Sequence, residues 1–244
     1  MILKDVFNRA IRFLKQVSGK DVWNWRQVKM RTLVVGKERY VICPDLLTSR
    51  SIVYSVGIGD DISFDLDIIE HFGATIYGFD PSPSSVAWIE KYNLPFQFKF
   101  FPYGVSDHDG EILLYRSENV EDDSVSLKGS TKEAFEAPVM RLSSIMKELG
   151  HTRIDLLKLD IEGMEYSVIK DMIDSEIKPM QLVVEFHHRF PEIGISMTKD
   201  TLRLLKKAGY KIVYINPSGD VYTFVRTNLA QSERQQAFSV YPNI

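Results

Sequence analysis

Two carboxylates directly follow an apolar segment near the middle of the chain. The string LLKLDIEGME at 156–165 places Asp160 and Glu162 after the apolar residues. Side chains alternate along a strand, so both carboxylates project to the same side if the extended backbone continues to Glu162. Because carboxylates are costly to bury without partners, Asp160 and Glu162 are candidate catalytic residues. The alternative is that Glu162 and Glu165 only complement the N-terminus of the following helix.

A second polar group, the string EFHH at 185–188, ends the next apolar segment. Alternation places Glu185 and His187 on one side and His188 on the other, so the two histidines are not expected to chelate one metal ion. A mixed metal site with the carboxylates of the previous strand is the alternative, but a single histidine at a strand end is more often a hydrogen-bonding residue. We therefore predict no metal centre and retain His187 as a candidate catalytic residue.

A glycine-containing turn, SVGIGD at 55–60, follows an earlier apolar strand. Gly57 and Gly59 let the backbone turn sharply and leave room for a ligand, although such turns also occur without one. The third glycine of a dinucleotide fingerprint is missing, because position 62 is Ile62. A pyrophosphate clamp is therefore poorly supported, and a ligand without phosphates is favoured. Asp60 could equally cap the next helix.

Acidic residues also follow the next two strands. Asp80 stands at the end of one strand, where an acidic residue can accept hydrogen bonds from both hydroxyls of a ribose. This position favours a ligand that contains a nucleoside. The alternative is a turn residue that precedes Pro81. Asp107 could meet an adenine amino group, although Asp109-Gly110 is a turn signal in its own right.

Strand and helix patterns alternate from Ser51 onward, which is typical of parallel βαβ units. Ligands of such sheets bind beyond the carboxyl ends of the strands, where the candidate residues stand. We predict an α/β fold with a doubly wound, mostly parallel sheet and a long loop over 117–132. Strands are predicted at 52–56, 75–79, 96–101, 111–115, 154–159, 182–186, 212–215 and 221–225, and helices at 62–72, 83–92, 142–149, 165–173 and 199–208.

Residues 1–50 are predicted to extend this domain, which spans residues 51–244. The extension contains a helix over 3–17 and a hairpin whose strands cover 28–35 and 40–43. The helix has an apolar stripe opposite basic residues. Such a helix can lie on a membrane, but we expect it to pack on its own domain or on a partner subunit, as the contact of a homo-oligomer.

Composition excludes several classes of protein. The 244 residues include 30 Lys+Arg and 33 Asp+Glu, a net charge of −3, with 44% hydrophobic and 26% charged residues. This is the profile of a soluble globular protein rather than of a basic nucleic-acid binder. Charges interrupt the N-terminal segment, and no run approaches the roughly 20 apolar residues of a membrane span, so no stable membrane insertion is expected. The single Cys43 fits a reducing compartment, and we expect a cytoplasmic location.

The string KLDIEGME at 158–165 resembles the K-hydrophobic-D-x-E-G-x-E signature of the FkbM-like S-adenosylmethionine-dependent methyltransferases. The resemblance extends over about residues 51–225, and includes the strings at 54–59, 78–81, 104–107 and 185–187. It implies a class I, Rossmann-like fold with a seven-stranded sheet, the last hairpin being inserted antiparallel. It also implies S-adenosyl-L-methionine as cofactor and O-methylation of a small-molecule or glycan acceptor.

The resemblance implies roles for individual positions. Gly57 and Gly59 would hold the methionine part of the cofactor, and Asp160 and Glu162 would line the methyl-transfer site. The set of candidate cofactor-binding residues is Ser55, Gly57, Gly59, Asp60, Asp80, Asp107 and Asp160. Ser55 departs from the pattern, since many members are acidic there; Asp60 or Asp160 could then meet the cofactor's ammonium group.

Methyl transfer from a sulfonium requires above all that the acceptor oxygen, the methyl carbon and the sulfur lie in line, and this alignment can lower the barrier by roughly 7–11 kcal/mol. With an alcohol acceptor, a general base raises the rate by about 10²–10⁴-fold. Glu162, Asp160 or His187 is the candidate base. One rival function is a nicotinamide-dependent reductase, which the missing third glycine disfavours. Another is a catalytically silent methyltransferase-fold binding protein, which Ser55 keeps open. A DNA or protein amide methyltransferase is disfavoured because no Asn-Pro-Pro-aromatic motif follows Asp160.

Overall fold

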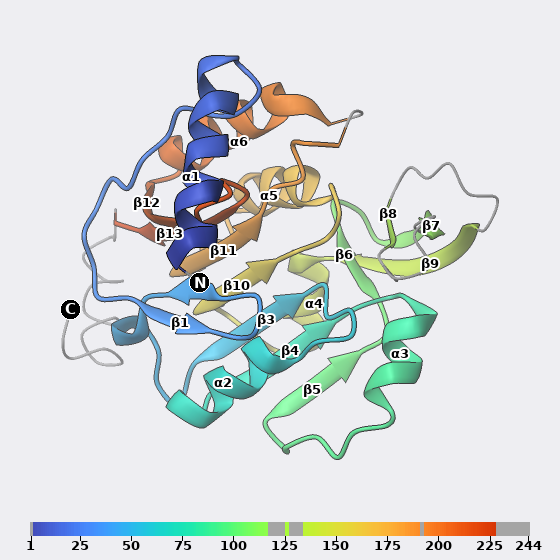
Figure 1. Ribbon diagram of the computed structural model, residues 1–244. Coiled ribbons are helices and arrows are strands. Elements are labelled where there is room, and N and C mark those ends of the chain that lie inside the picture. The colour runs from blue at the N-terminus through green and yellow to red at the C-terminus, as the bar shows by residue number, and fades with distance from the viewer. Residues whose placement is uncertain (1, 117–124, 127–133, 191–192, 228–244) are drawn as a thin grey trace.

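The computed structural model describes residues 2–116, 125–126, 134–190 and 193–227 (Figure 1). Its helices are α1 (Ile2–Val17), α2 (Ser63–Phe72), α3 (Pro83–Ile89), α4 (Leu142–Glu148), α5 (Glu165–Asp174) and α6 (Gly194–Lys207), with a short 3-10 helix at Pro44–Leu46. Its strands are β1 (Leu33–Val35), β2 (Tyr40–Ile42), β3 (Ile52–Val56), β4 (Thr75–Phe79), β5 (Phe98–Phe101), β6 (Gly104–Ser106), β7 (Gly110–Arg116), β8 (Val125–Ser126), β9 (Ala134–Arg141), β10 (Leu156–Leu159), β11 (Gln181–Glu185), β12 (Tyr210–Ile215) and β13 (Val221–Arg226).

The central sheet has seven strands in the order β12-β13-β11-β10-β3-β4-β5. Strands β5, β4, β3, β10 and β11 run parallel, while β13 pairs antiparallel with both β11 and β12. This arrangement confirms the predicted doubly wound α/β sheet with an inserted antiparallel hairpin. The strand order reverses between β3 and β10, so the crevice for a ligand is expected at their carboxyl ends.

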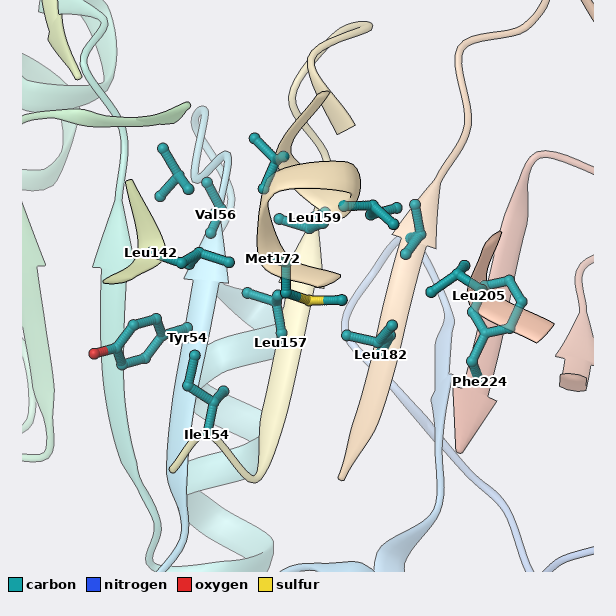
Figure 2. Packing of buried hydrophobic residues seen from close by; sticks show 14 of the residues in the cluster. Tyr54, Val56, Leu142, Ile154, Leu157, Leu159, Met172, Leu182, Leu205 and Phe224 are labelled. Atoms are coloured by element: carbon teal, nitrogen blue, oxygen red, sulfur yellow. The ribbon is translucent and has the colours of Figure 1, made fainter. Parts of the chain in front are cut away.

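Apolar residues of β3, β10 and β11 alternate between the two faces of the sheet. Tyr54, Leu157 and Leu182 pack toward α4, α5 and α6, as Figure 2 shows. Val53 and Leu156 point to the opposite face, which α2 and the β1–β2 hairpin cover. The central strands are thus buried on both sides, which explains their nearly continuous apolar sequence.

The β1–β2 hairpin docks on the sheet through buried polar contacts as well as apolar ones. The Gln181 side chain accepts from the Cys43 backbone N at 2.9 Å and donates to the Cys43 carbonyl at 3.3 Å. The Thr223 hydroxyl donates to the Val41 carbonyl. These bonds fix β2 against the amino end of β11 and the middle of β13, which leaves Tyr40, the first residue of β2, beside the carboxyl ends of β10 and β11.

A second sheet, in the order β6-β9-β7-β8, was not predicted as a unit. Strand β9 was missed, and β7 extends the strand predicted at 111–115. Of the loop predicted over 117–132, the structure describes only Val125–Ser126, which form β8; the rest lies outside the described residues. The Pro138 of β9 and its mixed polar sequence obscured a strand pattern.

Helix α1 lies on the turn between β12 and β13 through its polar side. The Nε and Nη2 atoms of Arg12 are buried there, next to Gly219. The apolar stripe faces away from the domain, with Phe7 64% and Leu14 65% exposed. Helix α1 therefore packs on its own domain, as one of the two predicted alternatives has it, but through its polar side and not through its apolar stripe; packing on a partner subunit stays a prediction. None of the described helices is long and apolar enough to cross a bilayer.

Truncation of the core should destabilise the protein strongly. Leu157 is fully buried in β10 (Figure 2), so Leu157→Ala should lower the free energy of unfolding by about 2–5 kcal/mol. Leu113→Ala is the matched control, because Leu113 is 46% exposed on β7, and its effect should stay within about 0.5 kcal/mol. Urea denaturation of both variants measures the difference; equal losses would contradict the assigned core.

Candidate functional site

A cleft of about 800 Å³ opens at the carboxyl ends of β3, β4 and β10. Its walls are the turn at 56–61, the segment 79–88 that leads into α3, and the loop 160–164. The ends of β6 and β11 close its sides. The cleft thus lies at the reversal of strand order and has the size of a site for a small molecule, roughly 300–1,000 Å³.

The two glycines of the turn after β3 serve different purposes. Gly57 has φ +81°, and a Cβ there would collide with the backbone oxygen of Asp160. Its N–H donates to the Phe79 carbonyl at 3.0 Å. Gly59 has φ +56°, and a Cβ there would meet nothing within 4 Å. Gly57 therefore packs the turn against its neighbours, while Gly59, which lines the cleft, has open space beside it.

Asp80 lies at the floor of the cleft and is only 7% exposed. Its Oδ2 accepts from the backbone N–H groups of Ile58 and Gly59, both at 2.9 Å. Its Oδ1 accepts from the Ser82 N–H at 2.9 Å and from the Ser82 hydroxyl at 2.6 Å. The carboxylate therefore joins the turn after β3 to the start of α3, a positioning role that the sequence did not reveal.

The other predicted cofactor contacts are distributed unevenly. Asp60 lines the cleft. Ser55 is fully buried within β3, on the face opposite Val56, and Asp107 lies beyond β6 with a half-exposed side chain; neither is among the residues that line the cleft. A hydrogen bond from His108, which outweighs partial burial, lowers the pKa of Asp107. Side-chain alternation explains the placement of Ser55, since Val56 takes the cleft side.

The chain after β10 turns instead of continuing as a strand. Strand β10 ends at Leu159, and Glu162 adopts φ +50°, a left-handed conformation that costs a non-glycine residue about 1–3 kcal/mol. A Cβ on Gly163, at φ +103°, would lie 2.6 Å from the Ile193 side chain. The extension assumed for Asp160 and Glu162 is therefore wrong, but this turn brings both carboxylates into the cleft.

His187 stands between three carboxylates. Its Nδ1 lies 3.3 Å from the fully buried Glu165, which also accepts from the His187 N–H at 2.9 Å and from the Gly163 N–H at 2.9 Å. Its Nε2 lies 3.4 Å from Glu162 and 3.9 Å from Asp160. Burial opposes the charge of the imidazolium, but the bond to Glu165 and the three negative charges raise the His187 pKa to about 9. His187 is therefore protonated at neutral pH.

Tyr40 of β2 joins the two strand ends. Its hydroxyl donates to Asp160 Oδ2 at 2.6 Å and lies 3.4 Å from Glu185 Oε2. Burial, and then the charges of Asp160 and Glu185, raise the Tyr40 pKa well above its usual range. Burial and the Asp160 charge raise the pKa of Glu185 to about 8. Tyr40 is therefore a permanent donor that fixes the Asp160 carboxylate.

Lys158 brings positive charge to the same place. It is 6% exposed, and its ammonium group donates to the Gly57 carbonyl at 2.9 Å. It lies 3.6 Å from Asp160 Oδ2 and 5.0 Å from the centroid of the Tyr40 ring. The same charge acts on Asp65, a buried residue of α2: burial raises the Asp65 pKa to about 6, and the Lys158 charge opposes this rise. Lys158 thus links the turn after β3 to the loop after β10.

Three residues of the cluster could also hold a metal ion. Asp160, Glu185 and His187 each offer a ligand atom, and these atoms lie within 4.8 Å of one another. His187 presents Nε2 to the cleft while Glu165 holds Nδ1, which is the usual orientation of a metal-binding histidine. The predicted absence of a metal centre stays a prediction.

Sequence patterns did not single out four of these residues, Tyr40, Lys158, Glu165 and Glu185, as site residues. Lys158 carries a local signal, because a lysine between leucines of a buried strand must find partners. Glu165 was considered only for the helix N-terminus. Tyr40 lies 120 residues from Asp160 in the sequence, so no local pattern could connect the two.

Comparison with known proteins identifies similar sequences. A family model described as the methyltransferase FkbM domain matches residues 43–212, more than half of the chain. The chain is 24% identical over 173 residues to the probable methyltransferase-like protein 24 of Rattus norvegicus, covering 70% of this chain and 42% of that protein. The Homo sapiens protein of the same description is 24% identical over 162 residues, 65% of this chain and 38% of the relative. The chain thus spans less than half the length of these curated relatives.

Among solved structures, methyltransferase FkbM from Methylobacillus flagellatus KT is similar, with a TM-score of 0.48 and 14% identity. The match covers 73% of this chain and 44% of that one. The match to the family model begins after β2, so Tyr40 lies outside it, while Asp160 and His187 lie inside.

The charge on His187 can be measured directly. Glu165→Gln should lower the His187 pKa from about 9 by roughly one unit or more, because a carboxylate no longer faces Nδ1. Histidine-ring NMR titration of the wild-type protein and of the variant reports this shift. Because the His187 pKa is higher in the folded protein (about 9) than in the unfolded chain (about 6.5), protonation of His187 stabilises the folded state. This stabilisation is complete below about pH 6.5 and is lost as the pH rises through about 9. A wild-type His187 pKa of 6.5 or lower would contradict this assignment.

Proposed function

The chain belongs to the methyltransferase FkbM domain family, and from this premise we propose that it is an S-adenosylmethionine-dependent methyltransferase that methylates a hydroxyl group of a small-molecule or glycan acceptor. The observation that carries the proposal is the combination of an open glycine turn with an acidic cleft. The cleft is lined by seven acidic residues, Glu38, Asp60, Asp61, Asp80, Asp160, Glu162 and Glu185, against Lys91, Lys158 and His187.

The charge of the cleft favours a cationic ligand over an anionic one. A sulfonium and an ammonium group are both positive, whereas the pyrophosphate of a dinucleotide is negative. The carboxylates of the cleft would repel it, even though the raised pKa of Glu185 leaves that residue mostly protonated at neutral pH. The space over Gly59 is open to a ligand that approaches the backbone closely. These features support S-adenosyl-L-methionine and disfavour the nicotinamide-dependent alternative.

The residues around the turn provide contacts for each part of the cofactor. We propose that Gly59 and Asp60 meet its methionine part, and that Asp80 meets its ribose. Since the Asp80 carboxylate already has four donors, a ribose hydroxyl would replace the Ser82 hydroxyl, which can rotate away. Trp88 of α3 and Leu114 of β7 add apolar surface to the same cleft.

When bound, S-adenosylmethionine supplies an electrophilic methyl group. The chain's own task is then to orient the acceptor hydroxyl and to take its proton. His187 already carries a proton at neutral pH, so it is a poor base and serves to position the carboxylates at its Nε2. Asp160 is restrained by Tyr40 and Lys158. We therefore propose Glu162 as the base that accepts the hydroxyl proton.

Cofactor binding is tested by filling the space over Gly59. Gly59→Ala should weaken the binding of S-adenosylhomocysteine at least about tenfold, because a methyl group would occupy the surface that the ligand approaches. Gly150→Ala is the matched control: Gly150 also has positive φ (+69°), and a Cβ there would likewise meet nothing within 4 Å, but it follows α4. Calorimetry on both purified variants measures affinity. Equal affinities for S-adenosylhomocysteine would contradict the site.

Catalysis is tested with isotopically labelled S-adenosylmethionine and a panel of hydroxyl acceptors, with and without a chelator. Glu162→Gln should reduce turnover about 10²–10⁴-fold with cofactor affinity retained. His187→Gln should reduce turnover less than Glu162→Gln does, and it should shift the pH dependence of turnover. An unchanged Glu162→Gln rate would remove Glu162 from the chemistry. Cofactor binding without transfer to any acceptor would favour a catalytically silent binding protein, and loss of turnover with chelator would favour a metal at Asp160, Glu185 and His187.

A further inference from the structure

Helix α1 presents its apolar side chains to solvent. Val6, Phe7, Phe13, Leu14 and Val17 are 56–65% exposed, and their spacing forms one continuous stripe. The opposite face is polar and rests on the domain, where Asn8, Arg12 and Gln16 are partly buried. An amphipathic helix on a globular domain ordinarily has the reverse orientation, so this stripe requires a partner outside the described structure.

Two tryptophans extend the stripe beyond the end of the helix. Trp23 is 55% and Trp25 is 71% exposed. The Trp23 ring packs edge-on against Phe13 at 6.0 Å between centroids, and its Nε1 donates to the Gln16 carbonyl at 3.0 Å. We call the surface formed by Val6, Phe7, Phe13, Leu14, Val17, Trp23 and Trp25 the α1 face.

The α1 face is concentrated in one place. It contains seven of the thirteen large hydrophobic residues that are exposed in the described part of the chain. The other six are distributed over β1, α2, β7, α6 and the segment after α3: Val34, Leu66, Leu113, Met197, Tyr92 and Phe96. The described surface thus offers no second apolar patch of this size to which a neighbouring copy could bind.

The segment that carries the α1 face is strongly basic. Residues 1–31 contain eight Lys/Arg and two Asp/Glu, a net charge of +6, whereas the rest of the chain contains 22 Lys/Arg and 31 Asp/Glu, a net charge of −9. Lys4, Arg9, Lys20, Arg26 and Lys29 are exposed beside the apolar side chains. Two such segments would repel each other, so the charge disfavours face-to-face pairing of two copies.

We propose that the α1 face binds the surface of an anionic membrane. Apolar and aromatic side chains on one side of a helix, flanked by lysine and arginine, suit the boundary between lipid head groups and acyl chains. Tryptophan is enriched at that boundary, and exposed basic side chains gain electrostatic attraction from acidic lipids. The helix would lie along the membrane surface, with the acidic remainder of the protein facing away from it.

The test is sedimentation of the full chain with sucrose-loaded vesicles of phosphatidylcholine, with or without phosphatidylserine. The wild-type protein should bind the phosphatidylserine vesicles at least about tenfold more tightly than phosphatidylcholine alone, and high salt should weaken this binding. Phe7→Ser/Leu14→Ser should reduce binding about tenfold or more, since both side chains leave water on binding. Lys4→Glu/Arg9→Glu should reduce binding to the vesicles that contain phosphatidylserine and leave binding to pure phosphatidylcholine vesicles unchanged.

Phe96→Ser/Leu66→Ser is the matched control, because it removes an exposed phenylalanine and an exposed leucine from elsewhere on the surface; it should bind vesicles as the wild type does. Circular dichroism verifies that each variant is folded. Absence of wild-type binding, or equal losses in both double serine variants, would overturn the proposal. A wild-type dimer that Phe7→Ser/Leu14→Ser converts to monomer would also overturn it, since the α1 face would then join two copies of the chain.

Discussion

The geometry of the cleft depends on one buried cation, the ammonium group of Lys158. A lysine inside an apolar strand is tolerated only if it finds partners. It finds them in the Gly57 carbonyl, the Asp160 carboxylate and the Tyr40 ring. One side chain thereby connects the turn after β3, the loop after β10 and the β1–β2 hairpin. These three segments are therefore held in one arrangement.

Around this cation the protein gathers more negative than positive charge. Asp80 joins the turn after β3 to the start of α3, Tyr40 fixes Asp160, and Glu165 keeps His187 protonated and directed at Glu162. The result is a cleft whose acidic groups are already oriented before a ligand enters, which reduces the reorganisation needed at binding. A positively charged cofactor and a hydroxyl acceptor suit such a site, whereas a phosphate-bearing ligand does not.

The sequence predicted the central sheet well, because apolar runs such as 52–56 and 75–79 and the glycines after them are local signals. It placed Asp160, Glu162 and His187 near one another because they follow neighbouring parallel strands, whose carboxyl ends lie at the same edge of the sheet. It could not show the turn at Glu162, which reflects a left-handed residue rather than a pattern. It also could not show Tyr40, whose contact spans distant segments, or the outward face of α1, since periodicity reveals a stripe but not what the stripe faces.

The most direct test of the cofactor site is a crystal structure of the full chain with S-adenosylhomocysteine. We expect the ligand in the cleft between Gly59 and the start of α3, with its sugar beside Asp80 and its sulfur facing the cluster of Asp160 and Glu162. An empty cleft in the presence of saturating ligand, or the ligand bound at another surface, would contradict this assignment.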